Sequence, residues 1–291
     1  MFGHKRRNVL LAFIAPALIM YVIFWILPVL MSFYYGLTNW KGVGTYDYIG
    51  FKNFKYLLRD GTLTNSLSNT VKYAIFSVIY GNVQALIIAM ILNMKLKAKG
   101  FFRTVFYIPA LFSTIVVAFI WSYVYAPYYG MMSEVVGAFG SDYVPNLLGN
   151  SSTALFATAF VEKWKASGAM TLIYLAGLQN IPEEVLESAK IDGCNAFRTI
   201  RHIKIPMLAN TITVNVMLGL ISGFKAFDYI FALTGGGPGS STSTLMYSVY
   251  KMAFIEGQYG MAEALAAAAF VLILVVSVIV LFIMKRKELE A

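Results

Sequence analysis

The sequence predicts an all-α integral membrane protein with six transmembrane helices. The first observation is composition: 59% of the 291 residues are hydrophobic and 13% are charged, whereas soluble domains have about 45–50% apolar and about 25% charged residues. The second is a set of six apolar runs, each long enough to cross the hydrocarbon core, which takes about 20 residues in a helix. The net charge of +9 therefore indicates basic residues gathered at one membrane face, and not a nucleic-acid surface.

The six predicted spans account for most of the chain, and residues 1–291 are expected to form a single transmembrane domain. The fourth and fifth spans contain charged residues and are the least regular. Long connections such as Thr38–Ser68 and Thr234–Met261 contain glycines that act as turn signals. The spans are Val9–Tyr35, Asn69–Met94, Thr104–Tyr125, Thr153–Asn180, Met207–Leu233 and Ala262–Met284.

The distribution of lysine and arginine predicts the orientation in the membrane. Six spans place both termini on the same side. If that side is the inside, the inner segments hold fourteen of these residues and the outer segments hold five. Because an excess of positive charge marks cytoplasmic segments, both termini are expected in the cytoplasm. The single cysteine, Cys194, then lies on the reducing side as a free thiol.

The connection between the fourth and fifth spans is predicted to form two short helices separated by a glycine. Pro182 suits the first turn of a helix, because its missing N–H is not needed there. Two glutamates follow at the positive end of the helix dipole. Gly193 can take the left-handed conformation that ends a helix. A second helix over about Ala196–His202 would complete a cytoplasmic unit at 181–206.

Two interpretations of this cytoplasmic unit follow from its residues. One is an amphipathic loop that lies on the membrane, with Lys190, Arg198, Arg201 and Lys204 bound to anionic headgroups. The other is a docking surface for a partner protein, contacted by acidic and apolar residues on either side of Gly193. The residue types alone leave both interpretations open.

The same unit contains a spaced motif. It consists of Glu187-Ser188-Ala189, then Gly193 after three residues, then Ile203-Lys204-Ile205-Pro206 after nine more. This motif resembles the signature loop of permease subunits in binding-protein-dependent ATP-binding-cassette importers, which reads Glu-Ala-Ala, Gly and Ile-x-Leu-Pro at the same spacings. The departures, at positions 188, 194 and 205, replace small residues by small ones and an aliphatic residue by another.

Further motifs are similar to the carbohydrate-uptake branch of that family. They are Ala176-Gly-Leu-Gln-Asn-Ile-Pro182, Phe227-Asp-Tyr-Ile230 and Thr234-Gly-Gly-Gly-Pro238. The chain looks most like the subunit that pairs with a second, homologous permease in sugar and glycerol-phosphate importers. The resemblance implies the type I importer permease fold in a bacterial or archaeal inner membrane, and it does not name the sugar.

The resemblance also implies partners and a division of labour. The chain would form half of a pathway for a sugar or oligosaccharide that an extracytoplasmic binding protein delivers. A second permease would complete the pathway, and two separate ATPase subunits would bind ATP and Mg²⁺. This chain would then have no catalytic residue, cofactor or metal, with lipid around its spans and no nucleic-acid partner. The residues implied to couple it to the ATPase are Glu187, Ser188, Ala189, Asp192, Gly193, Ile203 and Pro206.

Three charged residues lie deep in the fourth predicted span. Glu162, Lys163 and Lys165 come nine to twelve residues after its start, roughly 14–18 Å deep at 1.5 Å per residue. A charge at the bilayer centre costs about 2.5–3.5 kcal/mol on insertion scales. Either the span begins later and these residues lie in an outer loop, or they line a polar path. In the second case the indole of Trp164 offers a face for sugar C–H groups.

Small and polar residues recur at helical spacing along the fifth predicted span. Such a face is typical of close helix packing, and the alternative is that it leaves room for substrate. Both interpretations stay open on the sequence. The substrate-path candidates from the fourth and fifth spans are Trp164, Lys165, Ala169, Asn215, Gly219, Ser222, Gly223 and Ala226.

The sequence lacks the motifs of ATP hydrolysis. The run Gly235-Gly-Gly-Pro-Gly239 has no Lys-Ser/Thr end of a phosphate-binding loop, and it falls on the outer side. The energy for import must therefore come from another polypeptide. The alternative function is an ion-coupled secondary transporter or a channel, although the internal repeats of secondary carriers are not found. A structural scaffold would leave the deep charges unexplained.

Overall fold

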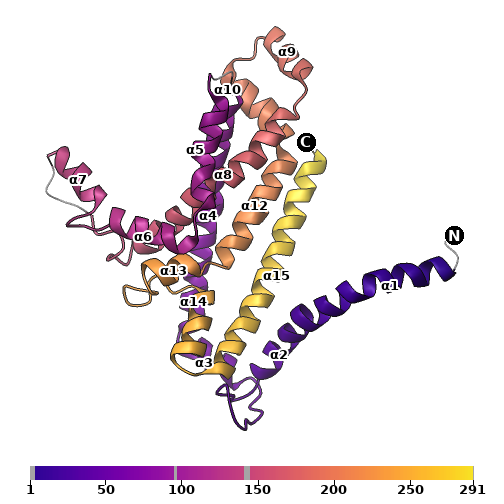
Figure 1. Ribbon diagram of the computed structural model, residues 1–291, viewed down its shortest axis with the longest axis vertical. Coiled ribbons are helices and arrows are strands. Elements are labelled where there is room, and N and C mark those ends of the chain that lie inside the picture. The colour runs from indigo at the N-terminus through magenta and orange to yellow at the C-terminus, as the bar shows by residue number, and fades with distance from the viewer. Residues whose placement is uncertain (1–3, 95–96, 141–144, 291) are drawn as a thin grey trace. The chain divides into compact units, whose positions relative to one another are not determined.

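The computed structural model describes residues 4–94, 97–140 and 145–290, and these residues are mainly helical (Figure 1). None of them belongs to a β-strand, although an isolated antiparallel bridge joins Thr38 and Tyr48. The prediction of an all-α protein is confirmed. Lys95, one of the basic residues that contribute to the predicted orientation, lies outside the described residues.

The chain forms two compact units. The first extends to Leu63 and includes Ser248–Val271, and the second contains Thr64–Tyr247 and the residues from Leu272 onward. Helix α15 begins in the first unit and continues into the second. The first unit contains α1 (His4–Tyr21), a π-helical turn (Val22–Ile26), α2 (Leu27–Tyr35), α3 (Lys52–Arg59), a second π-helical turn (Lys251–Ile255) and the start of α15 (Tyr259–Glu290).

In the first unit, the end of α2 approaches α15 closely. A Cβ atom on Gly36 would lie 2.9 Å from the Cα atom of Ala264, so a residue without a side chain is needed there. The loop that follows is held by the buried Asn53, whose amide donates to the backbone oxygens of Gly36 at 2.9 Å and Thr38 at 2.8 Å. The connection predicted at Thr38–Ser68 is therefore tied to the end of the first predicted span.

Helix α8 is the central element of the second unit. It packs against α5, α6, α12 and α13, and its buried residues contribute to three apolar clusters. A Cβ atom on Gly168 would lie 2.6 Å from the carbonyl oxygen of Phe106, so glycine lets α8 and α5 touch. Besides α8 (Ala154–Gln179), the helices that lie wholly or mostly in the second unit up to Phe224 are α4 (Thr62–Asn93), α5 (Lys99–Leu111), α6 (Thr114–Val124), α7 (Met131–Ala138) and α12 (Ala209–Phe224). They are followed by α13 (Asp228–Leu233) and by α14 (Leu245–Tyr250), which begins in the second unit and ends in the first.

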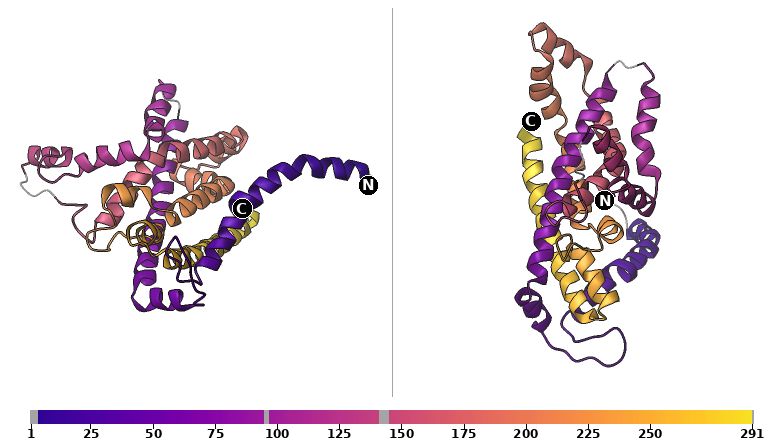
Figure 2. Two further views of the ribbon diagram at one scale, coloured as in Figure 1. Left: turned by 60° about the horizontal axis from the view of Figure 1, so that its bottom comes forward. Right: turned by 90° about the vertical axis from the view of Figure 1, so that its left-hand side faces the viewer.

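The segment between α8 and α12 forms two helices around a glycine, as predicted. Helix α9 (Glu183–Ile191) ends just before Gly193, whose φ of +73° is left-handed. The Asn195 side chain caps the next helix by accepting from the N–H of Arg198 at 2.8 Å. Figures 1 and 2 show the segment extending beyond the ends of α8 and α12. The second helix is longer than predicted and comprises α10 (Ala196–Thr199), a π-helical turn (Ile200–Lys204) and α11 (Ile205–Met207).

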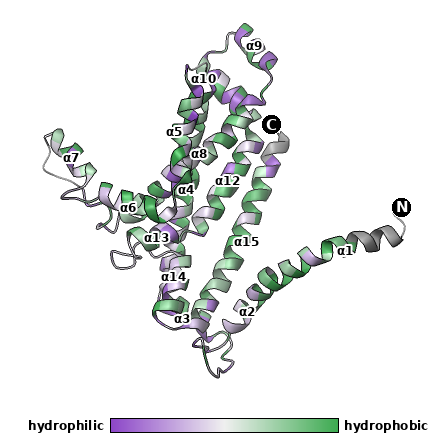
Figure 3. Ribbon diagram, viewed as in Figure 1, coloured by the Kyte–Doolittle hydropathy of each residue, from purple (hydrophilic) through white to green (hydrophobic). Residues whose placement is uncertain are grey.

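The described residues contain three helices long and apolar enough to cross a membrane, or up to five if each of two bent helix pairs counts as one span. Hydrophobic residues predominate along them in Figure 3. Helix α8 is continuous at nearly the bounds of the fourth predicted span, but its three charged residues keep it outside this set. The single helices are Phe13–Tyr35, Thr62–Asn93 and Tyr259–Arg286, and the pairs are Lys99–Leu111 with Thr114–Val124 and Ala196–Met207 with Ala209–Phe224.

The third and fifth predicted spans are not straight helices. Helices α5 and α6 meet at a bend of 99°. Pro109 lies in the last turn of α5, and the Ser113 hydroxyl oxygen accepts the N–H of Val116 at 3.3 Å, so α6 starts as a new helix. The fifth predicted span is interrupted between Phe224 and Asp228. Hydropathy does not report these breaks, because most residues on both sides of them are apolar.

Candidate functional site

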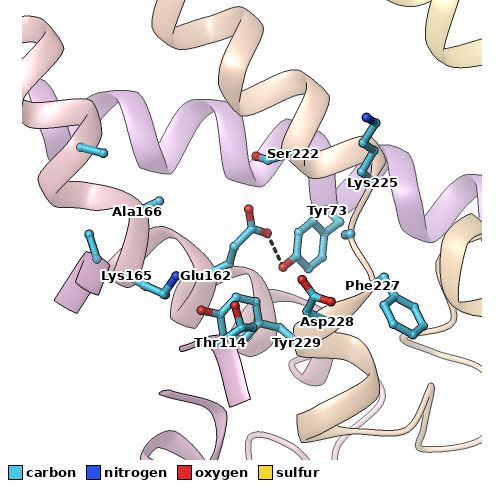
Figure 4. A pocket seen from close by; sticks show the side chains of 13 residues that line it. Tyr73, Thr114, Glu162, Lys165, Ala166, Ser222, Lys225, Phe227, Asp228 and Tyr229 are labelled. Carbon is cyan, nitrogen blue, oxygen red and sulfur yellow. Dashed lines mark hydrogen bonds between the residues drawn. The ribbon is translucent and has the colours of Figure 1, made fainter. Parts of the chain in front are cut away.

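A polar pocket of about 460 Å³ lies in the second unit, where α4, α5, α6, α8, α12 and α13 come together (Figure 4). Its walls combine ionisable side chains, aromatic rings and small residues. Two lysines and two carboxylates are among them, so their formal charges cancel. The lining residues are Tyr73, Ala110, Thr114, Glu162, Lys165, Ala166, Ala169, Ser222, Lys225, Ala226, Phe227, Asp228 and Tyr229.

One face of α8 forms a wall of this pocket. Glu162, Lys165, Ala166 and Ala169 follow the i, i+3, i+4, i+7 spacing that places residues on the same side of a helix. Lys163 is not part of the lining, and only 1% of its side chain is exposed. All three charged residues lie well inside α8, so they are helical and do not belong to a loop. The polar-lining interpretation fits the structure.

Hydrogen bonds connect this wall to α4 and α12. One carboxylate oxygen of Glu162 accepts from Lys163 Nζ at 2.7 Å. The other accepts from the Tyr73 hydroxyl at 2.6 Å, the bond drawn in Figure 4. Lys163 Nζ also donates to Ser222 Oγ at 2.7 Å. Buried charge pairs persist only with good geometry and additional hydrogen bonds, and both are present here.

The break between α12 and α13 forms a second wall. Asp228 is the first residue of α13, where a negative charge is favourable next to the helix N-terminus. The hydroxyl of the fully buried Thr244 donates to the carbonyl oxygen of Ala226 at 2.6 Å. This bond satisfies a carbonyl that the interrupted helix leaves free. The loss of helical structure after Phe224 thus presents charged and aromatic side chains to the pocket.

The structure brings half of the predicted substrate-path residues together. Lys165 and Ala169 on α8, with Ser222 and Ala226 on and after α12, line the same pocket. They come from two segments that are more than fifty residues apart in the sequence. The packing of α12 against α8 joins them.

Trp164 and Asn215 lie outside the pocket lining. The ring of Trp164 meets the ring of Trp121 edge to face, with centroids 5.4 Å apart, in an apolar cluster. Asn215 is fully buried and donates to the carbonyl oxygen of Met170 at 3.3 Å. Both side chains therefore contribute to contacts between helices.

Gly219 and Gly223 also lie outside the pocket lining, and they face α4. A Cβ atom on Gly223 would lie 2.6 Å from the Cα atom of Ala74, and one on Gly219 would lie 3.5 Å from a methyl carbon of Val78. For these two glycines the structure supports close helix packing, whereas Ser222 and Ala226 of the same face line the pocket.

Several lining residues are not among the sequence-based candidates. Tyr73 lies on the second predicted span, far from the others in sequence, and Lys225 and Asp228 lie near the predicted outer end of the fifth span, where charges need no special explanation. The motif Phe227-Asp-Tyr-Ile230 could have indicated these residues from the sequence. It places an acidic and two aromatic side chains close to a lysine in an otherwise apolar stretch.

The predicted coupling residues lie on and around α9–α11. Of the seven, Ala189 alone is buried, with 4% exposed, so it packs within its own chain. Two large apolar side chains beside them are strongly exposed, Ile191 at 86% and Phe197 at 67%. The exposed or half-buried coupling residues are Glu187, Ser188, Asp192, Gly193, Ile203 and Pro206.

Fold and pocket together define a helical membrane component with a polar site among its helices. Residues 81–288 match the family of binding-protein-dependent transport system inner membrane components, and the chain belongs to this family. It is therefore the membrane component of a transport system and not a catalytic subunit. The resemblance inferred from the motif between α8 and α12 is confirmed.

The chain is similar to its relatives over nearly its whole length. A probable starch degradation products transport system permease protein of Thermoanaerobacterium thermosulfurigenes is 32% identical over 280 residues, covering 96% of this chain and 94% of the relative. A multiple sugar-binding transport system permease protein of Streptococcus mutans is 36% identical over 278 residues, covering 95% of each. A bacterial transporter structure involved in import of the acidic polysaccharide alginate matches with a TM-score of 0.82 at 22% identity, covering 97% of this chain and 96% of the other. The chain thus has the type I importer permease fold.

Proposed function

We propose that this chain forms half of the translocation pathway of an ATP-driven importer, and that a sugar or oligosaccharide crosses the membrane past the polar pocket. The observation that carries the proposal is this pocket, enclosed by helices of a chain that belongs to an importer family. The names of the relatives, which refer to starch degradation products and multiple sugars, support a carbohydrate.

The chemistry of the pocket suits an uncharged sugar. Carboxylate oxygens accept hydrogen bonds from hydroxyl groups, and lysine ammonium groups donate to them. The rings of Tyr73, Phe227 and Tyr229 offer apolar faces for sugar C–H groups. Because the lining lysines and carboxylates are equal in number, a ligand without net charge can bind without leaving an unbalanced charge in the pocket.

Six spans are the topology that we propose for the membrane. The three single helices and two bent pairs supply five, and α8 supplies the sixth. Charges within a span face the interior of a bundle or pair with each other; in α8, Glu162 and Lys163 form a pair and Lys165 faces the pocket. The lysine and arginine distribution supports cytoplasmic termini in a bacterial or archaeal inner membrane.

The α9–α11 segment is the proposed contact with the ATPase subunits, and its exposed Ile191 and Phe197 support docking to a protein. Two ATPase subunits bind ATP and Mg²⁺, a second permease completes the pathway, and an extracytoplasmic binding protein delivers the sugar. This chain itself contacts lipid and holds no cofactor. The proposed coupling residues are those of the motif: Glu187, Ser188, Ala189, Asp192, Gly193, Ile203 and Pro206.

Purification from the native membrane followed by reconstitution tests the proposal. We expect an ATPase, a second permease and a binding protein to copurify. In proteoliposomes, the complex should take up radiolabelled maltose, trehalose or maltotriose only under one condition. ATP must be present on the side of the ATPase subunits, and the binding protein must be present on the opposite side. Uptake driven by a proton or sodium gradient, with no ATPase in the preparation, would establish the secondary-transporter alternative instead.

A further inference from the structure

The ammonium group of Lys163 is buried, and Lys163 is not among the residues that line the pocket. Its side chain is 1% exposed, whereas the neighbouring Glu162 is 15% exposed and lines the pocket. A charge in such a place is unfavourable unless it is paired and hydrogen-bonded. Lys163 is both, and its partner Glu162 faces the proposed substrate.

The surroundings of Lys163 are shaped to hold it. A Cβ atom on Gly81 of α4 would lie 3.1 Å from the Cδ atom of Lys163, so the missing side chain leaves room for the lysine stem. At its end, Nζ bonds to the Glu162 carboxylate on α8 and to Ser222 Oγ on α12, each at 2.7 Å. The Ser222 hydroxyl then donates to the carbonyl oxygen of Gly219 at 3.1 Å. Three helices therefore take part in placing one ammonium group.

We propose that Lys163 is a positioning residue for the substrate site: from behind the wall it fixes the carboxylate of Glu162 in the orientation that receives a sugar hydroxyl. One Glu162 oxygen is engaged by Lys163 and the other by Tyr73. An ionised carboxylate has about four acceptor sites, so positions on both oxygens stay available to the substrate. The proposal rests on the proposed function of the pocket.

A purely structural role for Lys163 makes a different prediction, and the two are separable. If Lys163 only stabilises the helices, Lys163→Met should lower stability and leave the sugar affinity close to that of the wild type. If Lys163 acts on the substrate through Glu162, Lys163→Met should weaken the sugar affinity, and it should have no further effect once Glu162 is already glutamine. A double-mutant cycle with Lys163→Met, Glu162→Gln and the double variant distinguishes these outcomes.

The first measurement is the thermal unfolding of the purified complex, which does not depend on knowing the substrate. Lys163→Met leaves the Glu162 carboxylate without its ion-pair partner, and Glu162→Gln leaves the buried Lys163 ammonium without its own. We expect each to lower the unfolding temperature by roughly 5–10 °C, and the double variant to recover most of that loss. Additive losses in the double variant would show that the two side chains are not coupled, and would overturn the proposal.

The second measurement is the concentration dependence of ATP-driven uptake of the best-transported sugar among maltose, trehalose and maltotriose. We expect Lys163→Met to raise the half-saturating concentration about tenfold, with the maximal rate nearly kept. The double variant should match Glu162→Gln and not the wild type. A wild-type half-saturation in Lys163→Met, or a further rise when Lys163→Met is added to Glu162→Gln, would overturn the positioning role and leave a structural one.

A matched control is the exposed pair of Lys251 and Glu256, whose charged atoms lie 3.3 Å apart. Lys251→Met, Glu256→Gln and their double should leave both measurements unchanged, because exposed pairs contribute little. If the wild-type complex takes up none of these sugars, the proposed function fails. The unfolding measurements then still decide whether Lys163 and Glu162 are coupled.

Discussion

Gly219 and Gly223, one turn apart on α12, differ in how much room α4 leaves them. A methyl group on Gly223 would press on the backbone of Ala74, whereas one on Gly219 would make ordinary contact with Val78. We expect Gly223→Ala to lower the free energy of unfolding by about 1–3 kcal/mol through overpacking. Gly219→Ala should be neutral or stabilise by up to about 1 kcal/mol, since alanine favours the helix. Thermal unfolding of the two variants checks this, and equal losses would contradict the packing described here.

The backbone of Gly193 provides a second prediction for a single residue. Its φ of +73° is unreachable for proline, which is fixed near −65°, and costs alanine about 1–2 kcal/mol. There is open space around it, so a side chain would not collide. Gly193→Pro should therefore change the direction of the α9–α11 segment and abolish sugar-dependent ATPase activity and uptake, while membrane insertion is kept.

Gly44 offers the control for this prediction, because it has a similar φ of +84° and open space but lies in the loop after α2. Gly44→Pro should retain most of the uptake. If Gly193→Pro transports normally, the assignment of α9–α11 as the contact with the ATPase is wrong.

At the scale of elements, the break between α12 and α13 depends on a hydrogen bond from a distant segment. Thr244→Val removes the donor to the Ala226 carbonyl and leaves that buried oxygen unsatisfied, which costs about 1–3 kcal/mol. We expect a lower unfolding temperature and weaker sugar affinity, because Ala226 and its neighbours line the pocket. Thr213→Val is the matched control, since its hydroxyl bonds only to a carbonyl of its own helix at Ala209. Thermal unfolding and uptake measurements on both variants compare the loss of the Thr244 bond across the break with the loss of the Thr213 bond within one helix.

Hydropathy predicted where the helices are and missed where they break. The apolar runs correspond to α2, α4, α8 and α15, since burial in lipid or protein favours the same residues along their whole length. The bend before Ser113 arises from a hydroxyl that caps a helix, and the break after Phe224 is held by Thr244. Such bonds leave no trace in a hydropathy pattern. The helix pair around Gly193 was predictable because proline and glycine act locally.

At the scale of the whole molecule, the single cysteine provides a test of orientation. Cys194 is partly exposed on the segment that is proposed to be cytoplasmic. A membrane-impermeant maleimide should label it in inside-out vesicles and not in intact cells. For the opposite side, Thr45→Cys in a Cys194→Ser background should be labelled in intact cells, since position 45 lies in the loop proposed to be outside. Labelling of Cys194 from outside would reverse the topology.

The site could be predicted from the sequence in part. Charged residues in an apolar run are conspicuous, so Lys165 and its neighbours were found. Tyr73 and Asp228 were not, because each is ordinary in its own segment and becomes part of the site only when α4 and α13 pack around α8. A pocket assembled from six helices depends on tertiary packing that one sequence does not display.

The ion pair of Glu162 and Lys163 lies on one helix, between adjacent residues, and that has a consequence for alternating access. A bridge between two helices must be pulled apart whenever those helices separate. Opposite charges on the same turn of one helix move together when α8 tilts or rotates, so their ion pair is kept. In the proposed importer, α8 can therefore change its orientation while Lys163 keeps Glu162 as its counterion.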